Sequence, residues 1–131
     1  MNTKLDKILA EISAGELVDK ITILEIKKNK ISDENKLKEI DKELNSLNNT
    51  MDKFILGKSK ILTFKDQLKE INLKLWDIED GKRTAEKNND FGKIFIELAR
   101  NVYKFNDERA KIKLKINEIL GSNIKEVKSH F

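Results

Sequence analysis

Apolar residues recur at steps of three and four along most of this chain, which is the spacing of one face of an α-helix. One such run lies in residues 33–56 and comprises Leu37, Ile40, Leu44, Leu47, Met51 and Phe54. A second lies in residues 60–88 and comprises Phe64, Leu68, Ile71, Leu75 and Ile78. A third, in residues 91–120, comprises Ile94, Leu98, Val102, Phe105, Ile112, Ile116 and Ile119. The pattern predicts three long amphipathic helices with seams of the coiled-coil type.

Residues 14–31 form a further predicted helix that is apolar on two sides. Leu17, Val18, Ile21 and Leu24 form one stripe, while Ile23 and Ile26 project from the other side. Ser13, followed by Glu16 three positions later, is a capping-box pattern that starts this helix at Ala14. A helix with two apolar sides is expected to lie in the centre of a bundle or in a subunit interface.

The chain ends and connections carry weaker signals. Residues 1–12 are predicted to form a short helix, because Leu5, Ile8, Leu9 and Ile12 share one face. Ser32 and Asp33 are candidate caps of the helix at 33–56, and Gly57 is a candidate left-handed stop. Asp90 is a candidate cap of the last helix, and Gly121-Ser122 the end of that helix. The tail, residues 122–131, is expected to pack through Ile124 and Val127.

These elements predict an all-α fold, a single domain over residues 1–131 that forms a four-helix bundle of long, antiparallel, coiled-coil-like helices. The antiparallel arrangement follows from the short connections at 57–59 and 88–90. The absence of proline agrees with the helical class. Because the apolar seams are long, we expect a homodimer.

Composition narrows the class of protein. The net charge is +4, with −1 in residues 1–81 and +5 in residues 82–131. The lysines are dispersed among acidic residues, so a nucleic-acid partner is not expected. With no cysteine and one histidine, His130, thiolate and imidazole chemistry is not expected either. There is no long apolar window and residues 1–12 do not have the pattern of a signal peptide, so we expect a cytoplasmic protein without a membrane partner.

Three sequence words cover much of the chain: ISAGELVDKITILEIK at 12–27, LWDIED at 75–80 and LARNVYKFNDERA at 98–110. In this order they resemble the words of a small, uncharacterised, all-helical family of bacterial and phage proteins. The resemblance implies no activity and no catalytic residue, because the function of that family is unknown. It also implies an extended segment before Ser13, whereas the apolar spacing predicts a helix there.

Arg109 stands within the apolar seam of the last helix, between Phe105 and Ile112. A guanidinium in such a position needs a carboxylate to offset its desolvation. Asp19 is a candidate partner because Ile23 and Ile26 flank it on the second apolar side of its helix. Glu79 and Asp107 are the other candidates.

Two interpretations of these residues remain open. In the first, Asp19, Glu79, Arg83 and Arg109 form a buried ion-pair network that sets the helix register. In the second, a pocket between helices binds an anionic small molecule such as a sugar phosphate or nucleotide. The residues of this predicted ligand site are Asp19, Trp76, Glu79, Arg83, Tyr103, Asn106 and Arg109.

An enzyme is the weakest alternative. Glu16 with Asp19, and Asp77 with Asp80, are carboxylate pairs at i and i+3 that could hold magnesium, as in all-helical pyrophosphohydrolases. The chain lacks the adjacent double glutamate expected of those enzymes. We expect no cofactor, except magnesium if the enzyme alternative holds. The preferred hypothesis is a non-enzymatic binding or accessory protein that contacts a protein partner through helical surfaces.

Overall fold

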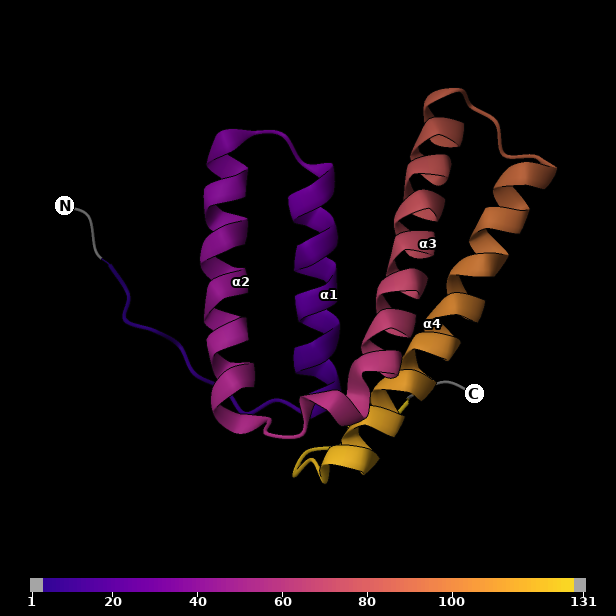
Figure 1. Cartoon of the computed structure of the whole chain (residues 1–131). Helices are drawn as coiled ribbons and strands as arrows, with labels where there is room; N and C mark the ends of the chain where they lie inside the picture. Colours follow the sequence, from indigo (N-terminus) through magenta and orange to yellow (C-terminus); the bar gives the residue numbers. More distant parts are fainter. Residues whose placement is uncertain (1–3, 129–131) are drawn as a thin grey trace.

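The computed structural model describes residues 4–128, which contain four α-helices, one short 3-10 helix and no strand. The helices are α1 (Ala14–Lys30), α2 (Glu34–Phe54), α3 (Leu62–Lys87) and α4 (Lys93–Leu120), and the 3-10 helix η1 (Lys58–Ile61) leads into α3. Consecutive α-helices run in alternating directions and form two hairpins, α1–α2 and α3–α4 (Figure 1). The predicted all-α class is confirmed.

Helix α1 occupies the centre of the fold. It packs against α2, α3 and α4, whereas α2 packs against no α-helix other than α1 within residues 4–128 and otherwise pairs Asp52 with Lys58 of η1. Of the two places considered for a helix with two apolar sides, the structure selects the interior of a single chain. Its residues Leu17, Val18, Ile21, Leu24 and Ile26 are all buried. Because α2 is attached on one side only, the ends of α2 and α4 are not packed against each other.

The predicted seams are longer than the packed part of each helix. The core takes Ile40, Leu44 and Met51 from α2, Leu68 and Ile71 from α3, and Ile116 from α4. Seam residues beyond it are exposed to solvent: Phe54 by 70%, Ile94 by 65% and Ile119 by 42%. Their inclusion in buried seams was wrong, because helical periodicity says which face is apolar but not how far a neighbouring helix extends along it.

Helix boundaries have the expected chemistry in three places. Ser13 Oγ accepts a hydrogen bond from the backbone N–H of Glu16 at 3.0 Å, and Asp33 caps α2 in the same way. Gly121 ends α4 in the left-handed conformation, with φ of 65°, and the N–H of Ser122 donates to the carbonyl of Asn117.

Two predicted boundary residues act differently. Gly57 has a φ of −98°, so it is not a left-handed stop, and α2 already ends before Ile55. The N-cap position of α4 is Gly92, while the side chain of Asp90 accepts a hydrogen bond from the N–H of Gly92 at 3.2 Å. The prediction of Asp90 as the cap was therefore wrong by two residues, because the aspartate closes the turn before the helix.

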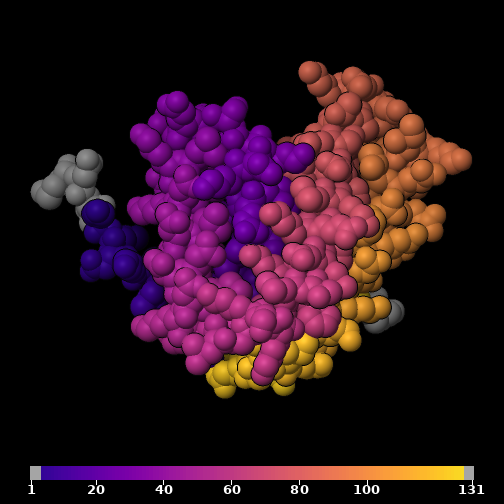
Figure 2. All heavy atoms as spheres, in the orientation of Figure 1, coloured from indigo at the N-terminus to yellow at the C-terminus, as the bar shows by residue number. Residues whose placement is uncertain are grey.

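The predicted N-terminal helix is wrong for residues 4–12, which are not helical. Leu5, Ile8 and Leu9 are 77%, 83% and 88% exposed, and residues 4–12 lead away from the body (Figures 1 and 2). An isolated helix of about twelve residues is marginal in water without a surface to cover its apolar face. The extended conformation agrees with the one implied by the family resemblance. Residues 1–3 lie outside the described part of the chain.

The tail is attached by polar contacts, and the predicted apolar packing of Val127 is wrong. Val127 is 90% exposed, although Ile124 is half-buried. Lys128 pairs with Asp107 at 2.8 Å, and Glu126 and Ser122 bind the start of α1. His130 and the last residue, with Ser129, lie outside the described residues. None of the helices in residues 4–128 is both long and apolar enough to cross a membrane.

Candidate functional site

A buried polar cluster lies where α1 meets α3 and α4. Asp19 and Thr22 come from α1, Asn72 from α3 and Arg109 from α4. Arg109 Nε lies 3.0 Å and 3.1 Å from the two carboxylate oxygens of Asp19, and Arg109 Nη2 also donates to Asp19 Oδ2. Asn72 Nδ2 donates to Asp19 Oδ1 at 2.9 Å and to Thr22 Oγ1 at 3.0 Å. The cluster thus ties three helices together around one carboxylate.

In this cluster, burial and hydrogen bonding have opposite effects on the pKa of Arg109. Asp19 has no exposed surface, whereas 28% of the Arg109 side chain is exposed. The hydrogen bonds to Asp19 raise the pKa of Arg109 above its ordinary value and outweigh its partial burial, which lowers it. The bidentate contact suits the planar guanidinium, so both oxygens of the buried carboxylate receive a donor.

The structure brings only two of the seven predicted ligand residues together, namely Asp19 and Arg109. Glu79 and Arg83 instead pair with each other along α3 at 3.3 Å, with 53% and 77% of their side chains exposed. Tyr103 is 55% exposed and Asn106 is also exposed, while Trp76 is half-buried. Glu79 and Arg83 therefore do not extend the buried network, because they lie on a solvated face of α3.

The four carboxylates of the magnesium alternative do not converge. Glu16 pairs with Lys113 of α4 and with Lys20, and Asp19 pairs with Arg109. Asp77 and Asp80 are exposed on α3. Among residues 4–128, no three histidine, aspartate or glutamate side chains are grouped as metal ligands would be.

A second polar cluster, at the start of α1, was missed by the sequence analysis. The first backbone donors of α1 are bound by side chains from the end of α4 and the tail. The N–H of Ala14 donates to Ser122 Oγ at 3.0 Å and that of Gly15 to Asn117 Oδ1 at 2.6 Å. Glu126 accepts from Ser13 Oγ and, at 3.1 Å, from Asn117 Nδ2. The first turn of α1 is therefore docked on α4.

This docking gives a structural role to the start of the first family-like motif, residues 12–27. Ser13 supplies the cap, Gly15 gives the close approach to α4, and Glu16 reaches Lys113 instead of closing the capping box. A glycine two positions after a serine cap is the only local signal of this contact. Its partner Asn117, which has no exposed surface, is about one hundred residues away, so sequence spacing cannot reveal it.

Glu126 should titrate at a lower pH than an unfolded glutamate. Partial burial raises its pKa. The hydrogen bonds from Ser13 and Asn117 and the charge of Lys113 lower it by more, so the net shift of the pKa is downward. A depressed pKa means that this contact stabilises the fold at neutral pH and loses that contribution as the pH falls through the folded pKa. Carboxyl NMR titration should show a low midpoint that rises in Ser13→Ala. A midpoint unchanged by that substitution would contradict the contact.

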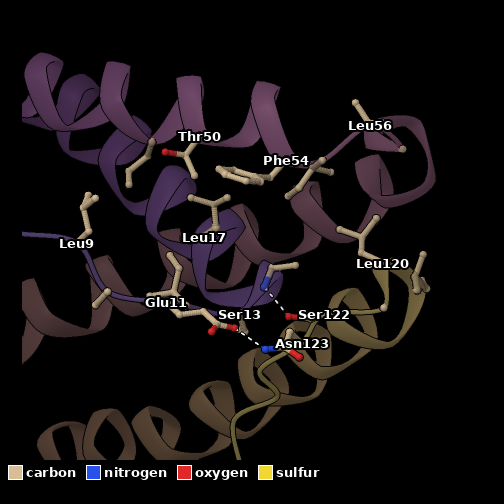
Figure 3. Close-up of a pocket in the computed structure, with 18 of the residues that line it drawn as sticks. Leu9, Glu11, Ser13, Leu17, Thr50, Phe54, Leu56, Leu120, Ser122 and Asn123 are labelled. Carbon is tan, nitrogen blue, oxygen red and sulfur yellow. Dashed lines mark hydrogen bonds between the residues drawn. The ribbon is translucent and has the colours of Figure 1, made fainter.

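An open apolar groove lies between the C-terminal ends of α2 and α4. It encloses about 1080 Å³, and residues 8–13 form one wall. We call it the α2–α4 groove. Outside this wall, its large apolar lining residues are Leu17, Leu47, Phe54, Ile55, Leu56, Ile119 and Leu120, and the wall itself adds Ile8, Leu9 and Ile12. Figure 3 shows Leu17 of α1 and Phe54 of α2 among the side chains that line the groove, with Ser122 and Asn123 just after the end of α4. None of the seven predicted ligand residues lines this groove or a smaller hollow between α4 and the tail.

Together these features define an all-helical protein with a satisfied internal ion pair and an open apolar groove. The chain belongs to a family of unknown function, DUF6165, whose model matches residues 8–130. Comparisons with curated proteins and with solved structures give no match. The family membership agrees with the resemblance seen in the sequence and, like it, names no activity.

Proposed function

We propose that this chain is a non-enzymatic binding or accessory protein that contacts other protein segments through the α2–α4 groove. The observation that carries this proposal is the contrast between its polar and apolar groups. Within residues 4–128, no buried side-chain nitrogen or oxygen lacks a hydrogen-bond partner. Apolar side chains, in contrast, remain exposed at the groove, with Phe54 at 70% and Leu56 at 92%.

Binding of an anionic small molecule is less well supported. Such a ligand would need Arg109, and it would compete for that side chain with a carboxylate that has no exposed surface. Removing the guanidinium from Asp19 leaves a buried carboxylate without a cation, which costs several kcal/mol (about 3–5). The other arginine of that hypothesis, Arg83, lies on the surface beside Glu79.

The lining of the groove indicates what kind of segment it binds. Its floor is aliphatic and aromatic, while its rim carries uncharged polar groups, Ser46, Thr50, Ser122 and Asn123. The charged residues in the lining are Glu11 and Lys60 alone. An amphipathic helix with apolar residues at i, i+3, i+4 and i+7 suits this surface, because it buries one face and keeps the other in water.

A model peptide tests the proposal. We expect a fluorescent helical peptide of leucine, alanine and glutamine, with leucine at i, i+3, i+4 and i+7, to bind saturably by fluorescence anisotropy. The double substitution Phe54→Glu and Leu56→Glu should weaken binding about tenfold or more, since each side chain buries apolar area in the complex. Both residues are exposed, so the fold should persist.

The matched control is Ile94→Glu with Ile96→Glu, two apolar residues of α4 that are 65% and 53% exposed and do not line the groove. This variant should bind the peptide as the unsubstituted chain does. Equal affinities of the groove variant and the control variant would contradict the proposal. So would an absence of binding to all of them at concentrations at which the chain is monomeric.

A further inference from the structure

Residues 4–12 have the sequence of an amphipathic helix but not the structure of one. We call them the N-terminal arm. Leu5, Ile8, Leu9 and Ile12 recur at helical spacing, and the charged residues Lys4, Asp6, Lys7 and Glu11 lie between them. The arm nevertheless exposes its apolar side chains, Leu9 by 88%. A segment of this pattern meets the requirement set by the groove for its occupant.

The root of the arm is fixed beside the groove. Ser13 caps α1, and the carboxylate of Glu11 accepts a hydrogen bond from Asn123 Nδ2 at 2.6 Å, as Figure 3 shows. Residues 8–13 thereby form one wall of the groove, while the earlier residues project from the body (Figure 2). To enter its own groove as a helix, the arm would have to reverse direction at residues held by these contacts.

We propose that the arm of each copy of this chain occupies the α2–α4 groove of a second copy, so that two chains form a reciprocal homodimer. This inference rests on the proposed function of the groove and names its occupant. Because each arm starts at the wall of its own groove, a two-fold axis near the arm roots places each arm against the groove of the other copy. Such an isologous contact closes after two subunits.

The chemistry of the arm and the groove is complementary. The apolar face of the arm would cover the aliphatic floor, while its two basic and two acidic side chains would remain at the neutral rim. The arm carries no net charge in residues 4–12, and Lys60 is the one charged lining residue outside the arm, so charge does not oppose the contact. On binding, residues 8–12 would leave the wall of their own groove and the arm would become helical, since the partner's groove supplies the apolar surface that an isolated short helix lacks.

Analytical ultracentrifugation of the full chain tests the inference. We expect a dimer, and we expect the arm variant, Leu5→Glu, which changes an arm residue that does not line the groove, to raise the dimer dissociation constant about tenfold. The groove variant, Phe54→Glu with Leu56→Glu, should have the same effect. The control variant, Ile94→Glu with Ile96→Glu, should remain dimeric. All five residues are exposed, so each variant should keep the circular dichroism of the folded chain.

Mixing the arm variant with the groove variant is the decisive measurement. The arm variant retains an intact groove, and the groove variant retains an intact arm, so a mixture should form a heterodimer through one intact contact. A monomeric unsubstituted chain, or a dimer that neither variant weakens, would overturn the inference. If the arm variant still binds the model peptide in that case, the groove remains a binding site for another protein. If it does not, the proposed function fails as well.

Discussion

Replacing Arg109 with methionine is expected to lower the free energy of unfolding by about 3–5 kcal/mol. Methionine keeps much of the length of the side chain, so the change removes the guanidinium without a large cavity. It leaves the carboxylate of Asp19, which has no exposed surface, with only the amide of Asn72 as a side-chain donor from another helix. Urea denaturation followed by far-UV circular dichroism measures the change.

Arg83→Met is the matched control for this prediction. Arg83 also pairs with a carboxylate, that of Glu79, but 77% and 53% of the two side chains are exposed. Solvent screens such a pair, and its loss should cost about 0.5 kcal/mol or less. Similar effects of Arg83→Met and Arg109→Met would show that Asp19 is not held as a buried charge.

A double substitution separates charge from packing. Adding Asp19→Asn to Arg109→Met should recover part of the lost stability, because a neutral amide is less costly to leave without a cation than a carboxylate. If the two substitutions instead add, the loss arises from packing around Arg109 and not from the buried charge.

Replacing Gly15 with alanine should have the second largest effect, a loss of about 2–3 kcal/mol of unfolding free energy. A Cβ at this position would overlap the backbone carbonyl oxygen of Lys113 and lie 2.9 Å from Asn117 Oδ1. The backbone of α4 cannot rotate out of the way as a flexible side chain can. The first turn of α1 would have to move away from α4, which breaks the hydrogen bond from the N–H of Gly15 to Asn117.

Gly57→Ala serves as the comparison for this substitution. A Cβ at Gly57 would meet only the side chain of Lys60, at 3.4 Å, and the φ of −98° is accessible to alanine. Its effect on thermal and urea unfolding should stay within about 0.5 kcal/mol. Equal stability of the two alanine variants would argue against the close contact between α1 and α4.

The partner of Arg109 illustrates how far sequence reasoning reaches into a site. An arginine in an apolar seam requires a carboxylate, and Asp19, Glu79 and Asp107 all satisfied that requirement in the sequence. The structure selects Asp19, because α1 lies between the two hairpins and presents it to α4. Glu79 fails because its face of α3 is solvated, and Asp107 binds Lys128 of the tail.

The sequence by itself determined the elements of this protein. Apolar residues at steps of three and four, with Ser13, Asp33 and Gly121 at the boundaries, predict four helices close to those observed. These signals are local, since a helix forms its hydrogen bonds and caps within a few residues. The requirement that Arg109 be paired was also readable, because desolvation of a charge is costly in any fold.

Only the tertiary structure decided the rest. The arm is extended and leaves most of its apolar face exposed, and a periodic pattern does not contain that information. The docking of Gly15 on Asn117 and Glu126 joins residues about one hundred positions apart. The α2–α4 groove exists because α2 packs on α1 alone. Each of these features depends on which helices meet and where each contact ends, and those distances are set by the packing of the whole chain.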